Sequence, residues 1–432
     1  MKHLTHILIF CMFFATAWAQ DNTTRILSPS VRTLRMQMVN HPTLFRPVLT
    51  LPVEGVIDGT DPDNTLELSF DELSHDVHQY TYTIRHLNAD LQPGDLQSFE
   101  YVRGFTTADI TDYEHSLNTQ VNYTHYSFTF PNEDMQIIHS GLYLLIIYED
   151  ANPENVVAQQ LFAVVEPKAS INTDIRSNTT LELAGHYQQL DIDVDTKALD
   201  MRTPDDIRLC VMQNGRWDNR VLSPKANYVE PNRLRWRDNN DLIFEGGNEY
   251  HRFDAYSVYF AGTNIDNITY QNGDYHCFLM PDQIGSFQYI HDFDADGQFI
   301  VNAERTDDSD TEAEYMWVHF FLQSEPLFDG SIFVGGDLFQ NHMSLSNRML
   351  YDNELGGYYL NTLVKQGGYN YQYWFRPKQS MGRSYGLGLK GATLRKTEGS
   401  HWETSNTYET FVFFRPFGAR ADRLVGYSSS SM

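Results

Sequence analysis

The chain has 432 residues, of which 57 are acidic and 31 basic, so its formal net charge is −26 at pH 7. Such a charge keeps a protein soluble and disfavours nucleic acid or anionic lipid headgroups as partners. The many aromatic residues, including 26 Tyr and 27 Phe, supply material for sheet cores, and the length suggests two or three domains.

Residues 1–19 have the pattern of an export signal. A short basic region and an apolar run precede an A-x-A cleavage site at residues 17–19, so we expect the mature chain to begin at Gln20. The apolar run is too short to cross a bilayer. Cys11 raises the possibility of a lipoprotein, but Phe10 precedes it where a small residue is needed. We therefore expect an exported protein without a direct lipid anchor.

Residues 26–166 are predicted to form an immunoglobulin-like β-sandwich. Residues 122–130 alternate in the period of two that separates the faces of a strand, and a Pro-Asn-Glu-Asp turn follows. Residues 141–148 are nearly continuous apolar residues, as expected of a strand buried on both faces. Further strands are predicted at 32–38, 66–70, 80–86 and 156–165. Glu166 and Pro167 mark the boundary of this domain.

The rest of the chain is predicted to form two more β domains, a central antiparallel domain over 168–325 and an early-set-like sandwich over 327–427, divided at Glu325-Pro326. Predicted strands of the central domain are 180–183, 189–194, 207–212, 242–244, 255–260 and 315–322; those of the last domain are 333–335, 357–364, 369–376, 408–415 and 424–427. The predicted fold class is all-β, with tandem immunoglobulin-like and early-set β-sandwich domains.

The cysteine and histidine residues show no metal-binding or redox spacing. Cys210 and Cys277 remain after signal removal, and the sequence leaves open whether they form a disulfide or two buried free thiols. The histidines of the first domain lack H-x-x-x-H and H-E-x-x-H patterns and are predicted to face solvent or pack within the sheets. They are His75, His78, His86 and His125.

One acidic stretch resembles half of a calcium loop. Asp292, Asp294, Asp296 and Gly297 have the right spacing, but the twelfth position is Ala303 instead of a bidentate acid. An Asp-rich hairpin turn is therefore the expected structure, with ion binding left open.

The acidic run at residues 306–314 is expected to be a solvated loop. A lone G-x-G-x-x-G at Gly386, Gly388 and Gly391 lacks the preceding strand and the following helix of a dinucleotide-binding loop, so we expect a flexible loop there. Walker, H-E-x-x-H and kinase motifs do not occur in the sequence. We therefore assign no catalytic, cofactor-binding or metal-binding residue and expect neither an enzyme nor a small-molecule substrate.

Several long strings are similar to one family. ITDYEHSLNT from Ile110, YTHYSFTFPNED from Tyr123, SGLYLLIIYED, LELSFDEL and RPFGARADRLVGY resemble the type IX secretion system plug proteins of Bacteroidetes, formerly a domain of unknown function. The resemblance covers about Val31 to Tyr427. It implies a non-enzymatic periplasmic protein that binds the outer-membrane translocon barrel and seals the pore when no cargo is engaged. The resemblance does not say which residues contact the barrel.

A weaker resemblance gives an alternative function, an exported glycan-binding β-sandwich. The run from Ile332 is similar to early-set modules that bind glycogen and starch, in which an aromatic residue of an Asn-rich turn stacks on the sugar. The matching position here is His342, after Asn341, and Trp374 is expected in the core. The chain also lacks a type IX sorting domain, so we expect it to remain in the periplasm.

Overall fold

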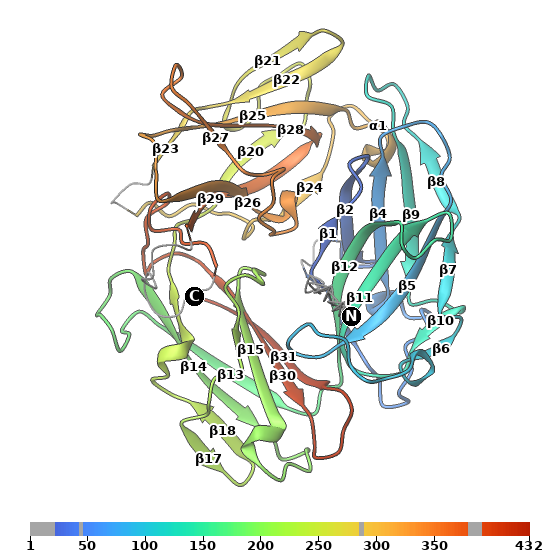
Figure 1. Cartoon of the computed structure of the whole chain (residues 1–432), viewed down its shortest axis with the longest axis vertical. Helices are drawn as coiled ribbons and strands as arrows, with labels where there is room; N and C mark the ends of the chain where they lie inside the picture. Colours follow the sequence, from blue (N-terminus) through green and yellow to red (C-terminus); the bar gives the residue numbers. More distant parts are fainter. Residues whose placement is uncertain (1–21, 43–45, 285–288, 379–390) are drawn as a thin grey trace, which may run out of the picture.

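The structure, a computed structural model, describes residues 22–42, 46–284, 289–378 and 391–432, and in these the strands form seven sheets. The predicted signal segment, Cys11, Gly386 and Gly388 lie outside the described residues. Figure 1 shows three β bodies arranged around a common centre. The predicted all-β fold class is confirmed. Helical structure in the described part is limited to single turns: α1 (Ser309–Glu312), η1 (Pro62–Asn64), η2 (Ser98–Glu100), η3 (Pro204–Asp206), η4 (Asn240–Leu242) and η5 (Asp337–Phe339).

The first sandwich contains every strand from β1 to β12. One sheet has the order β1 (Arg25–Ile26), β12 (Val156–Val165), β11 (Gly141–Glu149), β5 (Tyr80–Leu87) and β7 (Thr107–Ile110), with β3 (Val48–Thr50) parallel to β12. The other has the order β2 (Val31–Met38), β4 (Leu66–Glu72), β9 (Thr124–Phe130) and β8 (Asp112–His115). A small ladder joins β10 (Met135–Ile137) to β6 (Val102–Gly104). The prediction for 141–148 is confirmed, because all of β11 except Glu149 is buried.

The second sandwich is built from two distant parts of the chain. Its first sheet contains β13 (Ser170–Arg176), β14 (Tyr187–Asp195), β18 (Arg233–Trp236), β17 (Tyr228–Glu230) and β19 (Ile243–Glu245). Its second sheet contains β16 (Val221–Leu222), β15 (Ile207–Gln213), β30 (Thr407–Phe414) and β31 (Arg423–Ser431), in that order. The C-terminal hairpin β30–β31 therefore completes a sheet that begins with β15.

The third sandwich is inserted into the second. One sheet contains β20 (His251–Ala255), β29 (Gly367–Pro377), β24 (Phe299–Val301) and β26 (Gly330–Gly335). The other contains β21 (Ile265–Gln271), β22 (Asp274–Leu279), β25 (Tyr315–Gln323), β28 (Gly357–Lys365), β27 (Leu350–Asp352) and β23 (Asp282–Gln283). The chain enters and leaves this body at one place, since the His401 amide donates to the Gly247 carbonyl at 2.8 Å.

This pairing corrects the predicted division of the chain at Glu325-Pro326. Those residues lie between β25 and β26, two strands of the same sandwich that share one apolar core. The predicted C-terminal strands at 408–415 and 424–427 belong to the second sandwich instead. The prediction was wrong because a proline after a strand marks a turn, which occurs within sandwiches as well as between them.

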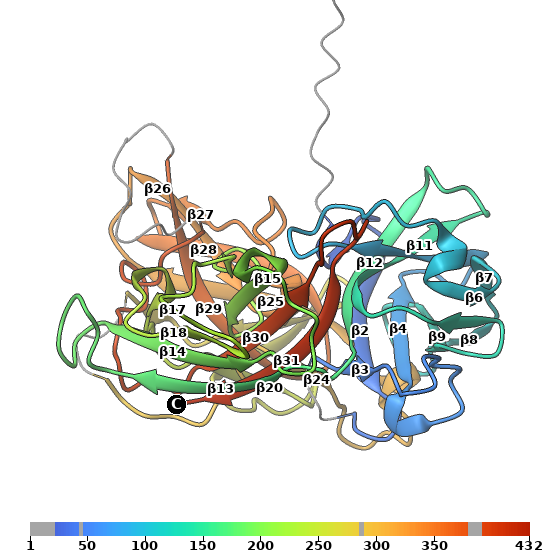
Figure 2. The same cartoon turned by 90° about the horizontal axis from the view of Figure 1, so that it is seen from below.

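The first and second sandwiches share a continuous apolar seam. The outer face of β11 contributes Leu142, Leu144 and Ile146, which pack against Phe411 and Phe413 of β30. Because β11 is buried by the sandwich core on one side and by this seam on the other, its sequence is apolar throughout. Figure 2 shows the hairpin β30–β31 lying beside β12 of the first sandwich.

Candidate functional site

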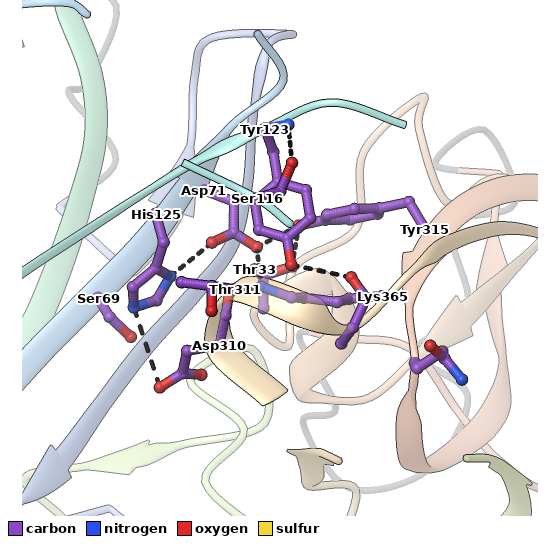
Figure 3. A network of polar contacts seen from close by, with 12 residues as sticks. Thr33, Ser69, Asp71, Ser116, Tyr123, His125, Asp310, Thr311, Tyr315 and Lys365 are labelled. Carbon is purple, nitrogen blue, oxygen red and sulfur yellow. Dashed lines mark hydrogen bonds and ion pairs between the residues drawn. The ribbon is translucent and has the colours of Figure 1, made fainter. Parts of the chain in front are cut away.

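A buried polar junction joins the first sandwich to the third, and Figure 3 shows its central residues. Asp71 of β4 is 0% exposed and Lys365, the last residue of β28, is 1% exposed. The Lys365 Nζ atom lies 2.7 Å from Asp71 Oδ2. Burial opposes the charge on Asp71, yet Lys365 and His125 together bring the pKa of that carboxyl below its usual value. The junction is therefore an ion pair that links two sandwiches within a shared interior.

Asp71 has two more partners. His125 Nδ1 lies 2.6 Å from Asp71 Oδ1, and the Tyr315 hydroxyl donates to Asp71 Oδ2 at 2.7 Å. The remaining protons of the Lys365 ammonium are also used, because it donates to the Asp310 carbonyl at 2.7 Å and lies 4.1 Å from the centre of the Tyr123 ring. Each charged group in this junction thus has the hydrogen bonds that burial requires.

The acidic run at 306–314 does not form the predicted solvated loop. It folds over the end of the first sandwich, where Glu314 accepts hydrogen bonds from the Gln120 and Val121 amides at 2.5 and 3.1 Å. Asp310 also pairs with Arg35 at 2.5 Å. The prediction failed at Asp310 and Glu314, because their partners lie in the first sandwich, far away in sequence, and a local charge run does not reveal such partners.

The apolar seam between the first and second sandwiches has a polar edge. Asp422, which is fully buried, accepts from the Ala89 amide at 2.9 Å, and its own amide donates to Asn88 Oδ1 at 3.0 Å. Arg208 pairs with the same carboxylate at 3.2 Å. The hairpin β30–β31 is thereby fixed to the loop that follows β5.

A cavity of about 380 Å³ lies where all three sandwiches meet. Its wall includes Met36 and Phe162 of the first sandwich, Phe411 of the second and Phe299 of the third. Arg35 and Arg46 also line the cavity, and the Arg46 guanidinium lies 3.6 Å from the Glu409 carboxylate. The three bodies therefore line one common, partly open cavity.

The calcium-like stretch lies near this centre and forms a turn. The Asp294 side chain accepts from the Asp296 amide at 2.9 Å and also from the Tyr250 amide. Burial raises the pKa of Asp294 to about 7. Gly297 has φ +86, the left-handed backbone typical of such a turn. Throughout the described ranges, no three or more His, Cys, Asp or Glu side chains are grouped as metal ligands.

The four histidines of the first domain that the sequence analysis named do not form one common cluster. His75 and His78 are partly or fully exposed, His86 is 2% exposed and packs against Gly141, and His125 joins the Asp71 junction. The role of His125 was missed by sequence reasoning. The signal available was an alternating strand in which it faces Asp71 across the β4–β9 ladder.

The two cysteines of the mature chain and Trp374 are all buried. Both cysteines are buried free thiols; Cys210 lies in the seam between the first two sandwiches and Cys277 in the core of the third. Trp374 is 0% exposed, and the Arg216 guanidinium lies 4.2 Å above its ring. Trp374 is therefore a core residue, as predicted, and its ring is not exposed as a platform for a sugar.

Among the described residues, no helix has the length and apolar character needed to cross a membrane. No curated protein matches the chain. A crystal structure of a hypothetical protein from Parabacteroides merdae ATCC 43184 is similar to it, with 32% sequence identity and a TM-score of 0.88. The similarity covers 95% of this chain and 99% of that one.

A family model described as the type 9 secretion system plug protein 1st domain matches residues 46–166. This match falls on the first sandwich, which includes the strings LELSFDEL, YTHYSFTFPNED and SGLYLLIIYED. The first sandwich of this chain belongs to the family of type 9 secretion system plug protein 1st domains.

Proposed function

We propose that this protein is a non-enzymatic periplasmic plug that binds the periplasmic side of the type IX translocon pore and seals it while no cargo is engaged. Membership of the first sandwich in the plug family supports association with the secretion system and a place in the cell envelope. The observation that carries the proposal is structural: the three sandwiches are joined by buried contacts, both polar and apolar, and not by linkers alone.

A seal of this kind needs a body that does not deform or thread through the opening it covers. Domains of one chain move relative to each other unless their interface is large and hydrophobic. Here the seam of β11 and β30 buries whole aromatic side chains, and the Asp71–Lys365 pair fixes the third sandwich to the first. The arrangement in Figure 1 is thus suited to act as one wide, stiff unit.

The test is a conductance measurement on the purified translocon barrel in a planar bilayer. Adding the mature chain to the periplasmic side should close most open channels. Adding the same amount to the opposite side should leave them open. The plug function is wrong if saturating protein leaves the conductance unchanged, or if the chain does not co-purify with the barrel from solubilised outer membranes.

A matched pair of variants separates rigidity from surface charge. Lys365→Met breaks the buried junction, whereas Lys168→Met removes a lysine that pairs with Glu166 at the surface. We expect the first variant to bind the barrel but leave residual conductance, and the second to seal as the natural chain does. Equal sealing by both variants would show that the junction has no part in the function.

A further inference from the structure

Two histidines lie side by side on the outer face of the larger sheet of the third sandwich. In β22 and β25 the side chains alternate, so that Cys277 and Val318 enter the core while His276 and His319 lie on the opposite face. Both histidines are partly exposed. Neither belongs to the junctions that join the sandwiches, so their arrangement requires a separate explanation.

The two imidazole rings face each other through nitrogen atoms. His276 Nδ1 lies 3.0 Å from His319 Nε2, and the rings are inclined by only 18°. On its other side, His319 Nδ1 lies 2.8 Å from Asn361 Oδ1, on the neighbouring strand β28. Phe278 stacks on the His319 ring with centroids 4.2 Å apart. The position and rotation of His319 are therefore fixed by contacts on two sides.

These contacts set the tautomer of His319. Because the Asn361 amide oxygen can only accept, Nδ1 of His319 carries the proton and Nε2 presents its lone pair to His276. An imidazole whose second nitrogen donates to an oxygen is the usual arrangement of a metal-binding histidine.

The spacing of the nitrogens is close to that of a bound metal. Two nitrogens that share a tetrahedral zinc ion are about 3.3 Å apart, given Zn–N bonds of about 2.0–2.1 Å. The observed 3.0 Å is slightly shorter, as expected of two rings that share a proton. A rotation of the partly exposed His276 ring, with transfer of its proton from Nδ1 to Nε2, directs both lone pairs to one point.

We propose that His276 and His319 form a surface site for a divalent transition metal ion such as Zn²⁺ or Cu²⁺, with Asn361 as the positioning residue. Imidazole ligands select these ions over Mg²⁺ and Ca²⁺, which prefer oxygen. The two imidazoles supply two of the ligands, and in this proposal water completes the coordination of the ion. Two ligands give a dissociation constant on the order of 10–100 μM, weaker than a structural zinc site.

Calorimetric titration of the metal-free mature chain with Zn²⁺ tests the proposal. His276→Ala and His319→Ala should each weaken binding at this site at least about tenfold, because one imidazole remains. The matched control is His75→Ala: the His75 and His115 rings are 5.1 Å apart, close to the 5.2 Å of the proposed pair, but His75 Nε2 and His115 Nδ1 bond to hydroxyl groups. This control should leave the titration unchanged.

Two further measurements distinguish the site from general histidine binding. Asn361→Ala should weaken Zn²⁺ binding roughly tenfold through loss of the oriented tautomer, and Asn361→Gln should weaken it less. Trp317, the cross-strand partner of His276, should be quenched by Cu²⁺, and Trp317→Phe should remove that part of the quenching. Melting in chelator confirms that each variant is folded.

The proposal is overturned if the folded His276→Ala and His319→Ala variants bind Zn²⁺ as tightly as the natural chain. It is also overturned if Zn²⁺ at 1 mM gives no heat with the natural chain, or if Trp317→Phe leaves the Cu²⁺ quenching intact. None of these results bears on the sealing of the pore, which is measured without added metal.

Discussion

Asp71 is the residue on which the junction between the first and third sandwiches depends. It is fully buried and accepts hydrogen bonds from Lys365, Tyr315 and His125. A buried ion pair contributes little net stability compared with an apolar pair, but removing one partner leaves an uncompensated charge in the interior. The pair therefore determines which packing is allowed more than how stable the chain is.

The first prediction concerns this pair. Lys365→Met should lower the free energy of unfolding by about 3–5 kcal/mol, because Asp71 remains buried without its cation. The measurement is urea unfolding followed by tryptophan fluorescence. Lys168→Met should change the free energy by less than about 1 kcal/mol, since the Lys168 side chain is 43% exposed and Glu166 keeps Arg423 as a second partner. Similar losses in the two variants would contradict the assigned role of the junction.

The second prediction concerns His86 and pH. Its ring is 2% exposed, and burial lowers its pKa to about 4 from the ordinary 6.5. Because the folded state holds the proton less tightly than the unfolded state, the stability due to neutral His86 is complete above pH 6.5 and is lost as pH falls towards 4. The loss is about 3 kcal/mol.

His86→Leu should remove this pH-dependent loss, so the natural chain and the variant differ in the slope of stability between pH 6.5 and 4. Chemical unfolding at a series of pH values gives both slopes. His75→Leu, at a more exposed position, should retain the natural slope. If His86→Leu also retains it, then His86 titrates normally.

The residue contacts that join the sandwiches could not be predicted from the sequence. Lys365 and Asp71 are 294 positions apart, and neither stands in a motif. A lysine directly after an apolar strand is usually solvated, so the local pattern around Val364 gave no reason to expect burial. The same is true of Asp310 and Glu314, whose partners lie in the first sandwich.

At the scale of the strands, local pattern was informative. The predicted strands at 122–130 and 141–148 match β9 and β11 to within two residues, because alternation and apolar runs are properties of the strand itself. The predicted strand at 180–183 was wrong. There Thr179 Oγ1 accepts from the Leu181 and Glu182 amides, and this side-chain turn replaces a ladder.

The order of the strands in the sheets was not predictable, since the pairing of β15 with β30 joins segments on either side of a complete sandwich. This pairing leads to the third prediction. A chain consisting of residues 168–325 should not fold, because it lacks β30 and β31 of the second sandwich and β28 and β29 of the third.

The control for this fragment removes the inserted sandwich as a unit. In this control, the mature chain is joined from Gly247 to His401 through two or three glycines, without the residues between them. The second sandwich should still fold, because Gly247 and His401 already share a hydrogen bond. Hydrogen exchange of both chains makes the comparison. Strong protection of β15 in the 168–325 fragment would contradict the insertion.

At the scale of the whole molecule, the buried seams imply that the three sandwiches unfold together. Domains with large hydrophobic interfaces do not behave as independent units. The reactivity of the two thiols shows whether the sandwiches unfold together, because Cys210 lies in the seam between the first two sandwiches and Cys277 in the core of the third. Burial raises the pKa of each to about 12, so neither is a reactive thiolate in the folded protein.

The fourth prediction is that both thiols of the mature chain become reactive over the same range of denaturant. Labelling with a maleimide, followed by mass spectrometry of the two peptides, gives each midpoint separately. In Lys365→Met the two midpoints should shift or separate, because the third sandwich is then held less firmly. A large difference between the midpoints in the natural chain would show that the sandwiches melt independently.

The insertion of one sandwich into another also has a consequence for how the polypeptide reaches its native state after synthesis. Contacts between β15 and β30 close a loop of roughly two hundred residues, and closure of long loops slows folding. If the inserted body forms early, its ends at Gly247 and His401 come together and the remaining loop becomes short. The second sandwich has unpaired strand edges until the last thirty residues or so are available. A chaperone that shields exposed β-edges would act in that interval.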